Sequence, residues 1–264
     1  MTSGSTLSNY DNPPLEEVAC GCFFEPLEGL KLPHTGLYWS SLRKDFPTIE
    51  HVAPAAKDGE FPPCDASTSL PLPRLWFLND DETRLIQFQV DQLFFNWRRR
   101  PNAPTYPRYP EVIRGFTDAY GKLAKVAAEV DIRPPKPTLL DLTYINTLVK
   151  GDDWSSVGSL SEVIKDFGWR EDTGRLLQLP RSILSQATYS LPNEQGQLIV
   201  KLVPGRKPDG SEVYSLQISA RGLGKDTTEP GMTAWFDMAH EWIVNAFDDL
   251  THTDVQLKRW RKRI

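Results

Sequence analysis

Two apolar runs with a two-residue period, at residues 74–78 and 84–97, constrain the fold of this chain more than any other feature. Alternation of this kind is typical of half-buried β-strands. In the second run the apolar positions change phase at Asp91-Gln92, from Ile86, Phe88 and Val90 to Leu93, Phe95 and Trp97. A phase change of one residue indicates a bulge or a reversal of the strand. Because Asp-Gln lacks the glycine that two-residue hairpin turns favour, we predict a bulge.

Periodicity also places the remaining elements. Apolar residues at helical spacing predict helices at 34–46 (ended by Pro47), 111–130 and 233–250, and a short helix at 159–169. The stripe expected to be buried in the last long helix comprises Trp235, Met238, Ala239, Trp242, Ile243, Ala246 and Phe247. Further strands are predicted within 15–27 and at 138–149, 182–191, 197–204 and 212–221. Residues 52–73 contain five prolines without any period, so we expect a loop there.

The order of these elements predicts an α+β fold with a mainly antiparallel sheet and helices packed on one face. The first half resembles a split β-α-β arrangement, and the second half reads β-β-β-α. We expect a flexible N-terminus at 1–11 and two halves, 12–151 and 152–264, that form one compact unit with a basic C-terminal tail.

Composition limits the class of protein. The net charge is −5, and 25% of the residues are charged, which is ordinary for a globular protein and disfavours a general nucleic-acid binder. The three cysteines, Cys20, Cys22 and Cys64, make no disulfide framework and indicate a reducing compartment. We expect neither a signal peptide nor a membrane span, and therefore a cytoplasmic protein without a membrane partner.

Motifs for known chemistry are mostly missing. The sequence HEWIV, which starts at His240, lacks the second histidine of a zinc-protease helix, so no metal site is predicted. There is no nucleophile elbow, phosphate loop or dinucleotide turn, and so we expect no cofactor and assign no catalytic residue. An enzyme with an unfamiliar site remains an alternative, built from His240, Glu241, Tyr144 and Asp141.

Two basic clusters are the candidate binding sites. The first comprises Asn96 and Trp97, followed by Arg98, Arg99 and Arg100; the second is KRWRKR at 258–263, with Arg259, Trp260 and Arg261. Each cluster offers cations for phosphate and an indole for stacking on bases. Strand alternation equally explains Trp97 as a core residue, and basic residues after a helix equally favour its dipole and keep a tail solvated. Tyr144 and Asn146 on strand 138–149 are further candidates, whose polar groups could bridge neighbouring backbone.

Several short motifs occur in a fixed order along the chain. They are Asn12-Pro13-Pro14-Leu15 followed by Glu17-Val18, Phe46-Pro47, the LIQF and DQLFFNW segments at 85–88 and 91–97, Tyr109-Pro110, and Tyr144-Ile145-Asn146. In this ordered set of motifs the chain resembles a sporadically distributed bacterial family, whose proteins have about 250 residues and no assigned activity. The resemblance covers about residues 10 to 250 and transfers no catalytic residue. It implies a prokaryotic accessory protein, and patchy distribution is typical of defence and toxin–antitoxin genes.

These observations lead to three hypotheses about function. The first is a non-catalytic protein that binds a protein partner, as an antitoxin, immunity or anti-phage defence component whose partner is encoded by a neighbouring gene. The second is a nucleic-acid-binding accessory protein that uses residues 98–100 and 258–263. The third is the enzyme with an unrecognised site.

Overall fold

The computed structural model describes residues 7–55, 73–101, 105–169, 174 and 176–263. The strands are β1 (Asn9–Tyr10), β2 (Leu15–Phe24), β3 (Thr48–Val52), β4 (Arg74–Leu78), β5 (Arg84–Gln89), β6 (Gln92–Arg98), β7 (Pro137–Val149), β8 (Ser185–Ser190), β9 (Gln197–Arg206), β10 (Glu212–Gly222) and β11 (Lys262–Arg263). The helices are α1 (Leu32–Leu42), α2 (Tyr109–Glu129), α3 (Glu229–Leu250) and α4 (Thr253–Lys258), with 3₁₀ turns η1 (Gly158–Glu162) and η2 (Pro192–Glu194). The α+β class and the antiparallel sheet are confirmed.

Nine strands are hydrogen-bonded in the order β3-β4-β5-β6-β2-β7-β10-β9-β8, and β1 pairs separately with β11. The chain divides into two compact units, each built from segments distant in the sequence. Unit 1 comprises 1–16, 143–220 and 237–264, and unit 2 comprises 17–142 and 221–236. The expected halves, 12–151 and 152–264, follow chain order instead, and their packing as one unit stays a prediction.

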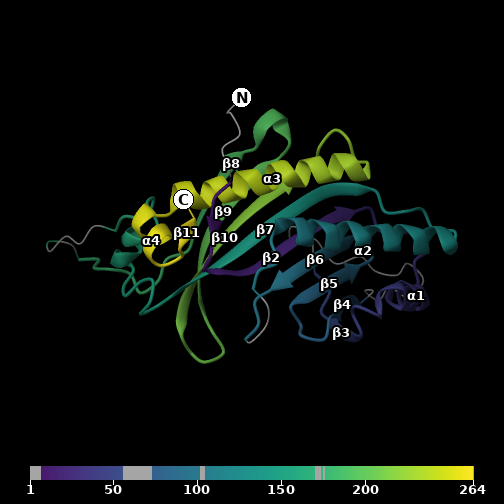
Figure 1. The fold of residues 1–264 in the computed structure, drawn as a ribbon, viewed down its shortest axis with the longest axis horizontal. Helices are drawn as coiled ribbons and strands as arrows, with labels where there is room; N and C mark the ends of the chain where they lie inside the picture. The colour runs from purple at the N-terminus through teal and green to yellow at the C-terminus, as the bar shows by residue number, and fades with distance from the viewer. Residues whose placement is uncertain (1–6, 56–72, 102–104, 170–173, 175, 264) are drawn as a thin grey trace. The chain divides into compact units, whose positions relative to one another are not determined.

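Unit 2 carries α1 and α2 on one face of strands β3 to β6 and β2 (Figure 1). Tyr38 of α1 is buried against the rings of Phe77 and Phe88, at centroid distances of 5.8 and 5.2 Å. The Tyr38 hydroxyl donates to the carbonyl of Ala119 in α2, which satisfies the polar end of a buried ring. The helix-facing residues of these strands therefore form the core of unit 2.

Helix α2 confirms the predicted stripe, because its expected apolar residues, Val112, Phe116, Ala119, Leu123, Val126 and Ala127, are all buried. The helix approaches β6 closely at Gly115. A Cβ atom there would lie 2.4 Å from a ring carbon of Phe95. Only glycine allows this approach, and it positions the first turns of α2 over the strand.

The predicted bulge at Asp91-Gln92 is wrong. Strands β5 and β6 pair antiparallel with Gln89 opposite Gln92, so Val90 and Asp91 form a two-residue hairpin turn. Neither turn residue has a positive φ, which explains why no glycine is needed. The end of β2 and the residues after it stabilise the turn, because the N–H of Phe24 donates to the carbonyl of Asp91 at 2.9 Å and the N–H of Leu27 donates to the carbonyl of Val90 at 3.0 Å.

Two other boundaries in unit 2 differ from expectation. Helix α1 begins two residues earlier than predicted and ends at Leu42, five residues before Pro47. Residues 48–52 form the edge strand β3, which the sequence did not predict because its side chains are mostly exposed and show no apolar alternation. Most of the predicted loop at 52–73 lies outside the described residues.

Unit 1 confirms strands β8, β9 and β10 close to their expected ranges. The predicted helix at 159–169 is wrong: only the 3₁₀ turn η1 forms there, and residues 163–169 are not helical. In the stripe expected to be buried in α3, Met238 and Ala246 are half-buried, and Trp242 is exposed, with 36% of its surface accessible.

The basic segment at the end of the chain is docked on unit 1 instead of forming a solvated tail. Strand β11 pairs with β1, so that Tyr10 lies opposite Lys262. Lys262 Nζ lies 2.8 Å from Asp248 Oδ2 in α3, and Arg263 Nη2 lies 2.6 Å from Asp11 Oδ1. The expectation of a free basic tail is corrected because carboxylates of this unit pair with its cations.

Candidate functional site

Strand alternation separates Trp97 from its neighbours in β6. Trp97 points to the helix-covered face of unit 2, is 3% exposed and packs on Tyr106 at 5.0 Å between centroids. This confirms Trp97 as an interior residue. Asn96 and Arg98 point to the opposite face of the sheet. Trp97 and the side chains next to it therefore form no joint stacking site.

On that opposite face Asn96 belongs to a polar ladder that crosses four strands. Arg74 of β4 donates to Gln87 of β5, Gln87 Nε2 donates to Asn96 Oδ1 at 2.8 Å, and Asn96 donates to Glu17 of β2. Burial raises the pKa of Glu17, although the bond from Asn96 and the charge of Arg98 partly oppose this shift. The ladder therefore gives both the oxygen and the nitrogen of the buried Asn96 amide a hydrogen-bond partner.

The other two arginines of the first cluster lie beyond the end of β6. Arg99 is exposed, and Arg100 Nε lies 3.4 Å from Glu82 Oε2. The cluster is thus divided, with Arg98 on the sheet face and Arg100 paired at the strand end.

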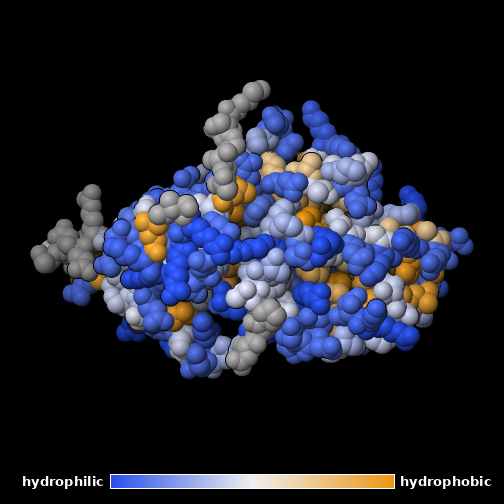
Figure 2. Space-filling model, in the orientation of Figure 1, coloured by the Kyte–Doolittle hydropathy of each residue, from blue (hydrophilic) through white to orange (hydrophobic). Residues whose placement is uncertain are grey.

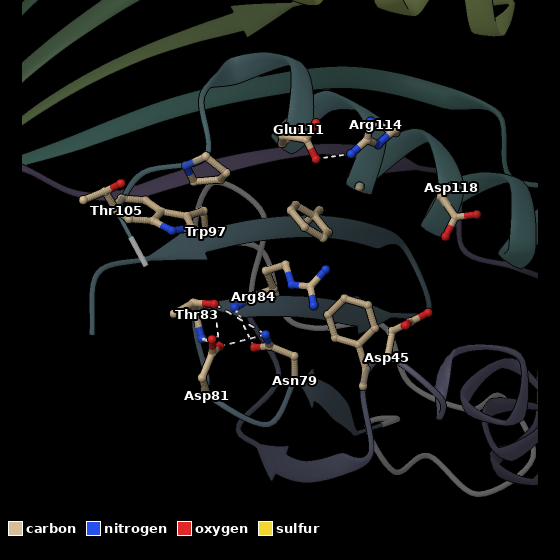
Figure 3. Close-up of a pocket in the computed structure, with 14 residues that line it drawn as sticks. Asp45, Asn79, Asp81, Thr83, Arg84, Trp97, Thr105, Glu111, Arg114 and Asp118 are labelled. Atoms are coloured by element: carbon tan, nitrogen blue, oxygen red, sulfur yellow. Dashed lines mark hydrogen bonds and ion pairs between the residues drawn. The ribbon is translucent and has the colours of Figure 1, made fainter. Parts of the chain in front are cut away.

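A hollow of about 540 Å³ lies on the helix side of unit 2, between β5, β6 and the start of α2 (Figure 3). Phe46, Phe95 and Trp97 form its apolar part. Its charged residues are Asp45, Asp81, Arg84, Glu111, Arg114 and Asp118.

Most charges in this hollow are already engaged. Asp81 accepts from the backbone and hydroxyl of Thr83, which lowers its pKa. Glu111 pairs with Arg114 on the same helix. Arg84 instead stacks on Phe46, with its guanidinium carbon 5.7 Å from the ring centroid. An exposed ring-stacked cation beside engaged carboxylates offers no acid–base pair for catalysis.

Tyr144 and His240 are brought together in unit 1. The Tyr144 hydroxyl lies 3.0 Å from His240 Nδ1, and burial lowers the pKa of His240 to about 4. A neutral imidazole that bonds to a buried hydroxyl is fully explained as a packing pair. Asn146, on the same strand, donates to the carbonyl of Leu216 at 3.3 Å and so ties β7 to β10.

The remaining members of the alternative catalytic set lie apart from Tyr144 and His240 in function, because one is paired elsewhere and the other is exposed. Asp141, in unit 2, is 4% exposed and pairs with Arg221 at 2.5 Å. Glu241, in unit 1, is exposed on α3. Among the residues with described positions, no three histidine, cysteine or acidic side chains are grouped for a metal ion.

The second basic cluster surrounds a buried indole. Trp260 is 3% exposed and lies 5.1 Å from the Phe247 ring. Arg259 donates to the carbonyl of Asp153 at 3.0 Å, and Arg261 is exposed with φ 53°. As packed here, Trp260 presents no ring face to a base, so stacking of the kind predicted would require unit 1 to open.

A groove that the sequence did not indicate runs along α3 in unit 1. Its volume is about 570 Å³, and α3 presents two parallel rows to it at four-residue spacing. One row is apolar, with Trp242, Ala246 and Leu250, and the other is polar, with Glu241, Asn245 and Asp249. Leu198 and Val200 of β9 and Tyr189 of β8 form the opposite side.

The groove carries three carboxylates and no cation. Asp166, Glu241 and Asp249 are exposed and form no ion pair with any residue whose position is described. A second hollow of about 400 Å³ shares Asp166 and includes the exposed side chains of Trp169 and Leu184. The visible face in Figure 2 is mostly hydrophilic, with apolar residues in small separate groups. The groove thus places the exposed rings of Tyr189 and Trp242 beside an acidic rim, and its lining is about equally polar and apolar.

Strand β8 forms one side of this groove and ends the strand order, with β9 as its one neighbour among the strands described. Its sequence, SQATYS, contains no charged residue, and all but its first residue are exposed. The other edge strand, β3, carries Glu50 and His51. Charges on an edge strand oppose pairing with another chain, so β8 is the edge that remains competent for strand addition.

Other features give no chemistry. Cys20 and Cys22 are free and fully buried, and burial raises the pKa of both thiols. Cys64 lies outside the described residues. No helix in the described part of the chain is long and apolar enough to cross a bilayer.

Comparisons with known proteins found no family model, no curated protein and no solved structure that matches this chain. The resemblance to a sporadic bacterial family therefore stays a prediction.

Proposed function

We propose that the protein recognises a protein partner through the groove of unit 1, by adding an extended segment of that partner to β8. The observation that carries this proposal is an uncharged, exposed edge strand beside a groove that combines an apolar row of α3 with carboxylates, none of which forms an ion pair with a described residue. Main-chain bonds to a sheet edge supply affinity, and the adjacent groove selects side chains.

The charges of the groove define the partner. A segment on β8 would direct every second side chain toward α3, because strand residues alternate between the two faces. Those side chains would contact Tyr189 and Trp242 and reach the carboxylates of Glu241 and Asp249. The segment that fits alternates lysine or arginine with apolar or small residues. Nucleic acid is disfavoured at this site because three carboxylates would repel its phosphates.

A defined peptide tests the proposal. The probe is a ten-residue peptide of alternating lysine and valine, with alternating glutamate and valine as the matched peptide. We expect the basic peptide alone to bind, and increasing salt to weaken it. The double charge reversal Glu241→Lys with Asp249→Lys should lower its affinity about tenfold or more, since two ion pairs become repulsive contacts.

The control is Glu162→Lys, which reverses an exposed charge of unit 1 in η1, away from the groove lining. It should bind the basic peptide like the unchanged protein. Recognition by the groove would be refuted if both peptides bound equally well. It would also be refuted if Glu162→Lys lowered the affinity for the basic peptide as much as the double charge reversal does. A dimer that dissociates on charge reversal would show instead that a second copy of the chain occupies β8.

A cytoplasmic antitoxin, immunity or defence role would be a specific case of this activity. It predicts that the partner, encoded beside this protein, contains a basic strand-forming segment.

A further inference from the structure

We infer that the helix-free sheet face of unit 2 binds a phosphate monoester at a site formed by Arg74, Trp76 and Arg98. This site is in the other unit from the partner groove and does not depend on the proposed function. The observation that points to it is a set of buried hydrogen-bond donors without acceptors.

Three buried side-chain nitrogens lack a hydrogen-bond partner in the part of the chain that is described, and all three belong to this site. They are Nε of Arg74, Nε1 of Trp76 and Nε of Arg98. A buried donor without an acceptor costs about 1–3 kcal/mol, and native proteins keep few of them. Three such donors in one place indicate that an acceptor belongs there.

The two arginines lie close to the ring of the third residue, Trp76. The guanidinium carbons of Arg74 and Arg98 lie 6.0 and 5.7 Å from the centroid of the Trp76 ring. Both arginines and the tryptophan point to the face opposite α1 and α2, because Trp76 pairs with Gln87 and Arg98 pairs with Glu17. The ring thus holds two cations in place, which lowers the entropy lost when they bind a ligand.

The two guanidiniums offer donors to an anion. Neither lies within ion-pair distance of a described carboxylate, although the charges of Glu17, Glu50 and Glu82 act on Arg98 from farther away. Burial is the largest influence on both, and it lowers the pKa of Arg74 and of Arg98. Their other bonds are to neutral oxygens, from Arg74 to the Gln87 amide and from Arg98 to the Glu82 carbonyl at 3.4 Å. Arginine forks match the oxygens of phosphate, so an oxyanion would satisfy both.

A monoester fits better than the alternatives. Three donors match the three terminal oxygens of a phosphate monoester, whereas a carboxylate or a phosphodiester offers two. Glu17 opposes the ligand, since its carboxyl accepts from Asn96 and lies across the ladder from Arg98. A neutral side chain at this position should therefore bind the anion more tightly, which gives a test with the opposite sign.

Calorimetric titration with inorganic phosphate and with AMP tests the site, using the full chain. Arg74→Gln and Arg98→Gln should each weaken binding about tenfold or more, because each removes a charge-assisted bond. Trp76→Phe keeps an aromatic ring beside both guanidiniums but removes the indole N–H, and it should also weaken binding. Glu17→Gln should strengthen binding about threefold or more, as one repulsive charge disappears.

Arg99→Gln is the matched control, because Arg99 adjoins Arg98 in sequence but is exposed beyond the strand. Its affinity should equal that of the unchanged protein. The inference fails if neither ligand binds at concentrations up to about 20 mM, because both Kd values would then lie well above the millimolar level. It also fails if Arg99→Gln lowers the affinity for these ligands as much as Arg98→Gln does. A single-stranded oligonucleotide without terminal phosphate that binds more tightly than AMP would overturn the monoester assignment.

Discussion

The burial of His240 makes unit 1 sensitive to acid. Burial lowers the pKa of His240 from 6.5 to about 4, and attraction by Asp237 opposes this only in part. Between these two pH values the unfolded chain binds a proton that the folded chain does not. Stability from this residue is therefore complete above pH 6.5 and is lost as the pH falls toward 4.

The magnitude follows from the same values. At 1.36 kcal/mol per pKa unit, the difference corresponds to about 3 kcal/mol of unfolding free energy. Urea unfolding, followed by tryptophan fluorescence from pH 4 to 8, should show that His240→Gln removes this part of the pH dependence. His51→Gln, on the exposed strand β3, should leave the pH dependence as it is.

Tyr144→Phe separates the hydrogen bond from burial. It should keep the pH dependence, since burial lowers the pKa of His240, while it lowers stability by about 1 kcal/mol for the lost hydrogen bond. If His240→Gln unfolds with the same pH dependence as the unchanged protein, the imidazole is not buried as a neutral group and the reasoning is refuted.

Two further changes test the packing. Gly115→Ala should destabilise by about 1–2 kcal/mol, because overpacking against Phe95 exceeds the gain in helix propensity, whereas Gly121→Ala, with no atom near its Cβ, should stabilise by up to about 1 kcal/mol. Urea midpoints measure both, and a stabilised Gly115→Ala would show that α2 can move away from β6. Trp260→Ala should cost about 3–5 kcal/mol as the loss of a buried ring, whereas exposed Arg261→Ala should change stability by less than about 0.5 kcal/mol. Equal thermal midpoints for these two variants would contradict the docked position of Trp260.

The alternation of apolar residues predicted most strands because each strand buries one face. It also predicted that Trp97 is interior, since Leu93, Phe95 and Trp97 share one phase. The turn at Val90-Asp91 could not be predicted in this way. Its bonds come from Phe24 and Leu27, which are distant in sequence, and its backbone needs no glycine.

The candidate sites were harder to predict than the fold. Helical periodicity placed Trp242 in the buried stripe of α3. Its side chain instead lines the groove beside the edge strand β8, and no further strand of the described sheet lies beyond β8 to bury it. Which strand is an edge depends on topology, and the uncharged sequence of β8 has meaning only once that position is known. The donors around Trp76 likewise come from strands whose register the sequence does not show.

The pairing of β1 with β11 has a consequence for how the protein is made in a cell. Arg263 and Asp11, which form an ion pair across these strands, are 252 residues apart in the chain. At a synthesis rate of about 5–20 residues per second, the first strand leaves the ribosome roughly 13–50 s before its partner. During that interval Tyr10 cannot yet be buried by β11, which has not been synthesised. A chaperone that shields the segment around Tyr10 would protect the nascent chain from aggregation.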